Sequence, residues 1–446
     1  MKLTLILPAI GKKSGEPYIK TWRLMEPLTI STLAAMIPDD VQLRFFDDRI
    51  ELIDYDESTD AVFIPVEMYT AKRAYKIGAK FRERGIPVIY GGYHPTLMTT
   101  ESLKYGDSVV VGNAENVIVD LINDLKNKSL KQIYCGENGF KSGQIPDRSI
   151  YGKRKYSPLA LIETGRGCVF NCEFCTITSA YDRKYHRREI SDIVEDIKSS
   201  GKKYIFFVDD NIVADEDYAI ELFKALAPLK IRWSGQGSLT MARNDELLKW
   251  MKKSGCMVVL IGYESMNPQI LKQMNKGWAY QSDERGALTE KIHSYGIGIY
   301  ATFVFGYDYE TNRDYEDALE FAMKHDFFFV AFNHLLPFPG TKLNDRLVAE
   351  NRLVHNEWWL QDGYKYGDIP YSVIGEMEGK ISEKCREIRH RYFSLKRLPG
   401  RALNAIKRYR DLISVFVFIS QNFNLKQEID GKLELPIGEG LDEYPK

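Results

Sequence analysis

The sequence predicts an α/β protein in which a doubly wound parallel sheet is followed by a partial (β/α)6 barrel and then by a helical tail. Apolar runs alternate with helical patterns up to about residue 130, and this alternation restarts at Leu159. The length of 446 residues also corresponds to two or three domains. We predict a first domain at 1–135, a linker at 136–157, the barrel at 158–345 and a C-terminal helical region at 346–446.

The first domain carries five short apolar runs with the Val and Ile content of buried parallel strands. This order predicts a Rossmann-like sheet, in which ligands bind at the carboxyl ends of the strands. The glycine-containing turns GGYHPT and VGNAEN stand at two of these ends. The expected strands are 3–8, 41–47, 61–66, 87–92 and 108–113, and the expected helices are 27–36, 70–85 and 114–127.

The second domain repeats a strand and a helix six times. Amphipathic segments such as SDIVEDIKSS and DELLKWMKKS separate the strands. Six such units predict an open barrel whose active site lies at the carboxyl ends of its strands, and a loop with three cysteines follows the first strand at this position. The expected strands are 159–164, 204–209, 230–235, 257–262, 298–306 and 328–335.

The composition argues against several classes of function. A formal net charge of -1 is not that of a general nucleic-acid-binding protein. The N-terminal apolar run is too short for a signal peptide, and no stretch of about 18 apolar residues is present to span a membrane. We therefore expect a cytoplasmic protein whose clustered thiols bind a metal or act in redox chemistry instead of forming disulfides.

Three of the six cysteines, Cys168, Cys172 and Cys175, lie within eight residues in the stretch TGRGCVFNCEFCTI. A structural zinc site takes four ligands, commonly in two pairs, and a ferredoxin cluster takes four thiolates. The other three cysteines are isolated and show no companion pattern. The third possibility is a 4Fe–4S cluster held at three irons, with the fourth iron open to a substrate.

The CxxxCxxC spacing, with an aromatic residue before the last cysteine, resembles the signature of radical S-adenosylmethionine (SAM) enzymes. The segment RGCVFNCEFC matches it, with Phe174 as the aromatic residue. The resemblance implies that Cys168, Cys172 and Cys175 bind a 4Fe–4S cluster, while the amino and carboxylate groups of SAM bind the fourth iron. Reductive cleavage of SAM would give methionine and a 5′-deoxyadenosyl radical, with the electron supplied by a flavodoxin-like or ferredoxin-like reductant.

The same resemblance extends over roughly residues 160–345 and implies a set of SAM contacts. A carboxylate from FVDDN, preferably Asp210, would accept hydrogen bonds from the ammonium of SAM, and the carboxylate of GYES would bind the ribose hydroxyls. Taken without the resemblance, these residues are also compatible with turn formers, helix caps and loop punctuation. The implied SAM-binding residues are Phe174, Asp209, Asp210, Gln236, Ser238, Glu264, Gly306 and Pro339.

The first domain resembles that of cobalamin-binding radical SAM enzymes in the stretches EPLTISTLAAMI, PVIYGGYHPTLM and VVVGNAEN. The resemblance implies cobalamin contacts by Gly91, Gly92, His94, Gly112 and Glu115. The D-x-H-x-x-G motif of many cobalamin proteins is replaced by FFDDRIELID, so we expect cobalamin without a histidine lower ligand. The alternatives are glycines that only serve tight turns and a domain that binds no cobalamin.

Together these resemblances imply radical C-methylation of an unactivated carbon, with SAM as the radical source and also as the source of the methyl group that cobalamin carries. The same cofactors would support a cyclisation or rearrangement without methyl transfer. An iron–sulfur electron carrier or a zinc-binding protein is the alternative of another class. The sequence does not identify the substrate, which we expect to be a small molecule or a lipid.

The C-terminal region is basic, with ten Lys or Arg residues between Lys384 and Arg410. The apolar segment LISVFVFIS follows at 412–420. This combination is typical of a helix that caps the barrel, and also of an interfacial helix in peripheral contact with an anionic membrane. We favour the cap.

Overall fold

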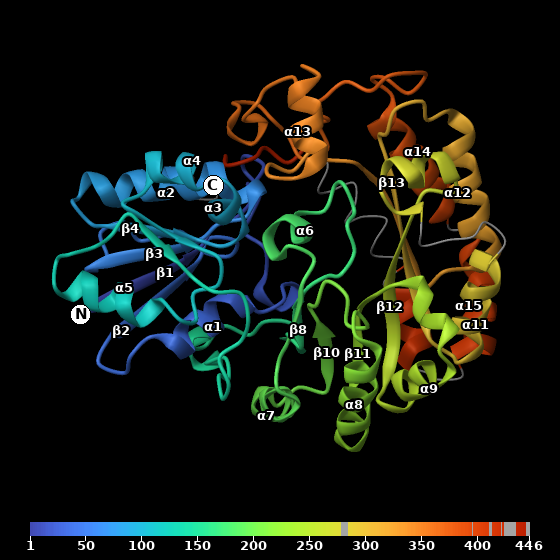
Figure 1. Cartoon of the computed structure of the whole chain (residues 1–446), viewed down its shortest axis with the longest axis horizontal. Helices are drawn as coiled ribbons and strands as arrows, with labels where there is room; N and C mark the ends of the chain where they lie inside the picture. The colour runs from blue at the N-terminus through green and yellow to red at the C-terminus, as the bar shows by residue number, and fades with distance from the viewer. Residues whose placement is uncertain (278–283, 395, 410–412, 421, 423–433, 443–446) are drawn as a thin grey trace.

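The computed structural model describes residues 1–277, 284–394, 396–409, 413–420, 422 and 434–442. It contains two six-stranded parallel sheets that lie side by side, one formed by the N-terminal third of the chain and one by the middle of the chain (Figure 1). The predicted α/β class, with a doubly wound sheet followed by a partial barrel, is confirmed. Among the described residues, no helix is long and apolar enough to cross a membrane.

The first sheet has the strand order β2-β1-β3-β4-β5-β6. Strand β2 is added on one side of β1, and β3 and the later strands are added on the other side. The five predicted strands are present, and a sixth short strand, β6, follows them. The strands are β1 (Lys2–Leu7), β2 (Gln42–Asp47), β3 (Ala61–Pro65), β4 (Val88–Gly91), β5 (Ser108–Val111) and β6 (Ile133–Cys135). The helices are α1 (Leu28–Met36), α2 (Ala71–Glu83), α3 (Tyr93–Leu97), α4 (Thr99–Tyr105) and α5 (Ile118–Lys126).

Both faces of this sheet are buried, which explains why its strands read as continuous apolar runs. Leu5 and Ile89 belong to the core on one face, whereas Ile6 and Tyr90 belong to the core on the other. Because neighbouring side chains of a strand point to opposite faces, each apolar run supplies both cores.

The second sheet has the strand order β14-β13-β12-β11-β10-β7, with β7 and β14 at its edges, so the barrel is open. All six predicted strands are present. They are β7 (Leu159–Ile162), β10 (Tyr204–Phe207), β11 (Arg232–Gly237), β12 (Cys256–Glu264), β13 (Gly298–Phe305) and β14 (Phe329–His334). The accompanying helices are α7 (Ile190–Ser200), α8 (Glu216–Leu226), α9 (Asp245–Lys253), α10 (Pro268–Gln273), α11 (Glu284–Ser294) and α12 (Asn312–His325).

A small antiparallel hairpin interrupts the second domain after its first strand. It pairs β8 (Gly165–Gly167) with β9 (Tyr185–Arg187), and α6 (Thr176–Tyr181) lies between the two strands in the chain. The three clustered cysteines follow β8 directly.

The segment that we predicted as a linker is packed. Tyr151 and Tyr156 are buried in the core of the first domain. Arg148, at the start of the 3-10 turn η3 (Arg148–Tyr151), pairs with Glu26 of the first domain at 2.7 Å and with Asp196 of α7 at 2.6 Å. These ion pairs join the two domains through the segment.

The C-terminal region contacts both domains instead of forming a tail on the barrel alone. The helices α14 (Ile381–Tyr392) and α15 (Leu398–Tyr409) cover the second domain, α14 against β14 and α15 against Phe328. Trp358 and Trp359, in the turn η7 (Trp358–Leu360), are buried in the core of the first domain. The helix α13 (Lys342–Ala349) precedes them.

Residues 434–442 return to the first domain, and we call them the C-terminal clasp. Their backbone pairs with the loop after β1, since Gly438 N donates to Ile10 O and Lys12 N donates to Glu439 O. The Asp442 carboxylate lies 2.9 Å from Arg73, which also forms a buried ion pair with Asp48. Because Arg73 belongs to α2, the clasp lies against this helix of the first domain (Figure 1).

Candidate active site

The three clustered cysteines line one cavity of about 160 Å³ at the carboxyl ends of the barrel strands. This is the edge at which βα barrels place their active sites. The cavity wall includes residues that follow β10 and residues at the ends of β11 and β12. Its polar and thiol-bearing side chains include Cys168, Cys172, Cys175, Asp210, Glu264 and Lys276.

The cluster loop, residues 168–175, is fixed through Glu173. The Glu173 carboxylate accepts a hydrogen bond from Arg346 Nε at 2.8 Å and from the Tyr307 hydroxyl at 3.2 Å. Its backbone N–H donates to Met274 O, and its carbonyl accepts from Leu343 N. The loop is therefore held by residues that lie more than a hundred positions later in the chain.

The three clustered cysteines are half-buried. Burial raises the pKa of the Cys172 thiol to about 12 and also raises the pKa values of Cys168 and Cys175. Neutral thiols are thus favoured until a metal binds, because a metal deprotonates its thiol ligands.

The donor set fits an iron–sulfur cluster. Among the described residues, no group of three His, Cys, Asp or Glu side chains could hold one metal ion. A 4Fe–4S cluster does not need such convergence, since each thiolate binds a different iron. The imidazole of His186, the distant candidate for a fourth zinc ligand, belongs to β9 and does not line the cavity.

The two adjacent aspartates after β10 have different surroundings. The Asp209 carboxylate accepts hydrogen bonds from the backbone N–H of Thr164 and from its hydroxyl, the latter at 2.6 Å. Asp210 lines the cavity and accepts a hydrogen bond from Gly167 N at 3.2 Å. Burial raises the pKa of Asp209 to about 7 and that of Asp210 to about 6. Asp209 therefore holds the chain before the cluster loop, and Asp210 is the carboxylate that faces the cavity.

Glu264 reaches the cavity from an irregular end of β12. The pairing of β12 with β13 shifts between Gly262 and Glu264, and Glu264 has a φ of 62°. This left-handed conformation is unfavourable for a residue with a Cβ, and it is found where a site constrains the backbone. The Glu264 carboxylate is 2.7 Å from Lys276 Nζ.

The other residues predicted to bind SAM divide into two groups. Phe174, Gln236 and Ser238 line the cavity with the cysteines, as their assignment requires. Gly306 and Pro339 are not among its lining residues. The Gly306 carbonyl accepts a hydrogen bond from Tyr371, and Gly340, next to Pro339, lies against Leu97 of α3. These two turns therefore pack against other segments, and their contact with SAM stays a prediction.

The residues predicted to bind cobalamin also divide. Gly91 and Gly92 stand at the carboxyl end of β4, and Gly112 follows β5, so all three lie at the edge that binds ligands in such sheets. The imidazole of His94 is buried instead, and its Nε2 is 2.9 Å from Glu101 Oε1. Trp359 donates to the same carboxylate.

Glu115 forms an ion pair with a residue of the second domain. Its carboxylate is 2.6 Å from Arg166 Nη1, two residues before Cys168. His94 and Glu115 thus have partners within the protein, and their contact with cobalamin stays a prediction.

The carboxyl edges of the two sheets meet at this place. Helix α3, which follows β4, contacts α6, which follows the cluster loop. The rings of Tyr93 and Tyr181 from these two helices pack edge to face, with centroids 6.4 Å apart. The site of the second domain therefore lies next to the ligand-binding edge of the first.

Two functional candidates were not predicted from the sequence. Lys276 belongs to no recognisable motif. It lies in a loop after α10 and contacts Gly262 of β12. Glu173 is inside the cysteine motif, but its partners are remote in the chain. For Lys276, one signal was present in the sequence. Gly262, two positions before Glu264, indicates that another group approaches the backbone closely there.

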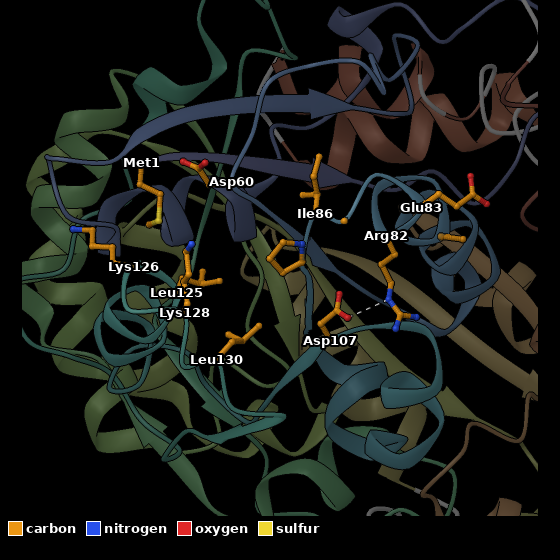
Figure 2. A pocket seen from close by; sticks show the side chains of 13 residues that line it. Met1, Asp60, Arg82, Glu83, Ile86, Asp107, Leu125, Lys126, Lys128 and Leu130 are labelled. Carbon is orange, nitrogen blue, oxygen red and sulfur yellow. Dashed lines mark hydrogen bonds and ion pairs between the residues drawn. The ribbon is translucent and has the colours of Figure 1, made fainter.

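A larger hollow of about 1180 Å³ lies on the opposite side of the first domain (Figure 2). Its lining comes from residues that precede the strands, such as Met1, Asp60 and Asp107, and from the end of α5. Two of its carboxylates accept backbone hydrogen bonds, Asp60 from Lys2 N and Asp107 from Val88 N. Because this is the amino edge of the sheet, we assign no ligand to it.

The family comparison agrees with this site. Residues 162–322 match the model of the radical SAM superfamily, and this range includes the three cysteines and most of the cavity. The fold and the site thus define a radical SAM enzyme, a class that uses a 4Fe–4S cluster and SAM, takes small-molecule substrates and requires a reductant.

Comparison with whole proteins narrows the class. The chain is 32% identical to bacteriochlorophyllide d C-12(1)-methyltransferase of Chlorobaculum tepidum, over 85% of this chain and 86% of the relative. It is 26% identical to hopanoid C-2 methylase of Rhodopseudomonas palustris, over 75% of this chain and 66% of the relative. The chain belongs to the radical SAM methyltransferase family.

A solved structure has the same fold. The radical SAM methyltransferase TsrM from Kitasatospora setae, with cobalamin and a [4Fe-4S] cluster bound, superposes with a TM-score of 0.64. The match covers 86% of this chain and 84% of that chain at 17% sequence identity. The order of the two domains is therefore shared with a protein of known cofactor content.

Proposed function

We propose that this enzyme methylates an unactivated carbon of a small molecule or lipid, using the cluster, SAM and cobalamin. The observation that carries the proposal is the contact between α3 and α6, which brings the ligand-binding edge of the first domain next to the cysteine cavity of the second. A carrier bound at the first edge would share one reaction space with SAM bound at the second.

The first domain offers a fitting edge for cobalamin. Gly92 has a φ of 101°, and a Cβ there would lie 2.9 Å from Val66 O, so only glycine allows this turn after β4. Gly91 is more open, with Val110 Cβ as the nearest atom to its Cβ position at 3.7 Å. A solved protein of the same fold was determined with cobalamin bound. We propose that Gly91, Gly92 and Gly112 line the cobalamin site, without a histidine below the metal.

The residues of the second domain have separable tasks. Cys168, Cys172 and Cys175 would hold the cluster, and Asp210 would accept hydrogen bonds from the ammonium of SAM. Glu264 would bind the ribose hydroxyls. When bound, these groups supply a 5′-deoxyadenosyl radical from SAM and a methyl group carried by cobalamin; the protein supplies orientation and exclusion of water.

We infer a substrate class from the names of two relatives. The two named above act on a bacteriochlorophyllide and on a hopanoid. Both substrates contain fused or linked rings, and we propose a ring-containing small molecule or lipid as the substrate here also. A purified bacteriochlorophyllide and a hopanoid are therefore the first probes to supply, with mass spectrometry to detect a methyl group in place of a hydrogen.

We also propose that the enzyme is cytoplasmic and makes peripheral contact with membranes through its C-terminal helices. In the described part of the tail, Ala405, Tyr409 and Phe418 pack on the barrel, whereas Leu403, Ile406 and Phe416 are exposed. Of the predicted apolar segment 412–420, Leu412 lies outside the described residues. Phe416→Ser should reduce co-sedimentation with anionic liposomes at low salt; equal sedimentation of the wild type and the variant, or none with either, would remove this proposal.

The cofactor proposal is tested by spectroscopy and product analysis. The protein, reconstituted with iron and sulfide and incubated with hydroxocobalamin, should retain corrin absorbance after gel filtration. With SAM, reductant and a substrate, it should form 5′-deoxyadenosine and S-adenosylhomocysteine together. Formation of 5′-deoxyadenosine alone would indicate radical chemistry without methyl transfer, and loss of the corrin would contradict a role for cobalamin.

A further inference from the structure

Lys276 is a cation in the wall of the cysteine cavity that the proposed function does not yet use. It lies just after α10, and its side chain is only 14% exposed. Its Nζ donates to Glu264 Oε1 at 2.7 Å and to Gly262 O at 3.0 Å. The ammonium therefore binds both the side chain and the backbone at the end of β12.

The end of β12 is shaped to receive this ammonium. A Cβ at Gly262 would lie 2.1 Å from Glu264 Oε1 and 3.0 Å from Lys276 Nζ, so any larger residue would displace the pair. The shift in strand pairing and the left-handed φ of Glu264 bring its carboxylate back over Gly262. The backbone conformation of Glu264 and the absence of a side chain at Gly262 thus both allow the contact between Glu264 and Lys276.

The charge of Lys276 also acts on the cysteines. Lys276 lines the same cavity as Cys168, Cys172 and Cys175, and this cavity has a volume of only about 160 Å³. A positive charge in a cavity walled by protein stabilises nearby negative charge more strongly than it would in water.

A cluster bound by three thiolates gains a further negative charge when it accepts one electron. The potential of such a cluster depends on nearby charge, hydrogen bonds and solvent exposure. Lys276 balances the negative charge of Glu264 in this cavity, so loss of its positive charge would leave that carboxylate unpaired beside the cluster. The unpaired carboxylate would disfavour the reduced state, which is the state that donates an electron to SAM.

We propose that Lys276 is a positioning residue that raises the reduction potential of the cluster and holds the Glu264 carboxylate in place for the ribose of SAM. This rests on the proposed function, because it assigns a role toward the same cluster and SAM. The electron comes from a low-potential reductant and passes to the cluster, and Lys276 itself is neither oxidised nor reduced.

The test compares three variants of the reconstituted protein with the wild type. Lys276→Gln removes the charge, Lys276→Arg retains it, and Lys272→Gln removes an exposed charge four residues earlier. Titration with dithionite, followed by electron paramagnetic resonance, gives the midpoint potential of the cluster. We expect a more negative potential in Lys276→Gln, and potentials near that of the wild type in Lys276→Arg and Lys272→Gln.

The role toward Glu264 has a separate readout. The dissociation constant of SAM, measured by equilibrium binding to the oxidised protein, should rise about tenfold in Lys276→Gln, the effect of losing a hydrogen bond between charged groups. It should change little in Lys272→Gln.

Several outcomes would overturn the proposal. One is an unchanged midpoint potential in Lys276→Gln at full iron content, and another is an equal shift of the potential in Lys272→Gln. A third is loss of the cluster from both Lys276 variants, because arginine keeps the charge and should therefore keep the cluster. Failure of the wild type to form 5′-deoxyadenosine would instead contradict the proposed function, and the potentials could still be compared.

Discussion

Glu115 of the first domain and Arg166 of the second form an ion pair across the domain boundary, with 2.6 Å between Oε1 and Nη1. Arg166 also binds Glu163 and packs over the ring of Phe140. Because Arg166 lies two residues before Cys168, the position of the first domain is coupled to the start of the cluster loop.

Glu115→Gln should weaken this coupling. Arg166 keeps Glu163 as a partner, so we expect a loss of about 1–3 kcal/mol, that of a buried hydrogen bond between charged groups. The melting temperature should fall, and the cluster should be lost faster on exposure to a chelator. Glu137→Gln, which changes an exposed carboxylate of the adjoining segment, is the control. Equal behaviour of the two variants would contradict the role of the pair.

The two aspartates after β10 should give different phenotypes. Asp210→Asn removes the carboxylate that faces the cavity, so SAM should bind about tenfold or more weakly while the protein remains folded and binds its cluster. Equilibrium binding of SAM and the iron content measure the two effects.

Asp209→Asn should act on stability instead, because its carboxylate holds the N–H and hydroxyl of Thr164. We expect a lower melting temperature before any change in SAM affinity. The assignment would be reversed if Asp209→Asn weakened SAM binding at an unchanged melting temperature.

The clasp can be displaced by one methyl group. A Cβ at Gly11 would lie 1.8 Å from Pro436 O, so Gly11→Ala should cost about 1–3 kcal/mol, as overpacking does, and should free the clasp for proteolysis. Gly400→Ala is the matched control, since a Cβ there meets nothing within 4 Å. Thermal unfolding and limited proteolysis should separate the two variants. Identical melting temperatures would show that the clasp contributes no stability.

His334 should make the fold sensitive to mild acid. Burial, aided by the charge of Arg389, lowers the pKa of His334 from 6.5 to about 4. As the pH falls from about 6.5 to about 4, the unfolded chain binds a proton that the folded chain does not, so stability decreases over this window. His334→Gln should therefore lose less melting temperature than the wild type between about pH 7 and pH 5. A steeper loss in the variant would be the opposite result.

Much of the fold could be predicted because its strands are buried on both faces, which leaves continuous apolar runs in the sequence. The cysteine motif is local, so its position after β7 and its place in the cavity were accessible. Asp210 and Glu264 were accessible for the same reason, since Asp210 lies three residues after β10 and Glu264 is the last residue of β12.

The residues that could not be predicted depend on contacts between distant segments. Lys276 meets Gly262 and Glu264 only after β12 ends in a bulge. His94 looked available for a cofactor in the sequence, but Glu101 and Trp359 enclose it, and Trp359 comes from the opposite end of the chain. The C-terminal clasp has no periodic pattern, and its burial depends on the loop after β1.

The central claim is that three thiolates hold a cluster whose open iron binds SAM for reductive cleavage. Anaerobic incubation of the reconstituted protein with SAM and dithionite, followed by chromatography of the nucleosides, measures it directly. We expect 5′-deoxyadenosine from the wild type and none from Cys172→Ala. Absence of 5′-deoxyadenosine from the fully reconstituted wild type, or its formation by Cys172→Ala, would contradict the claim.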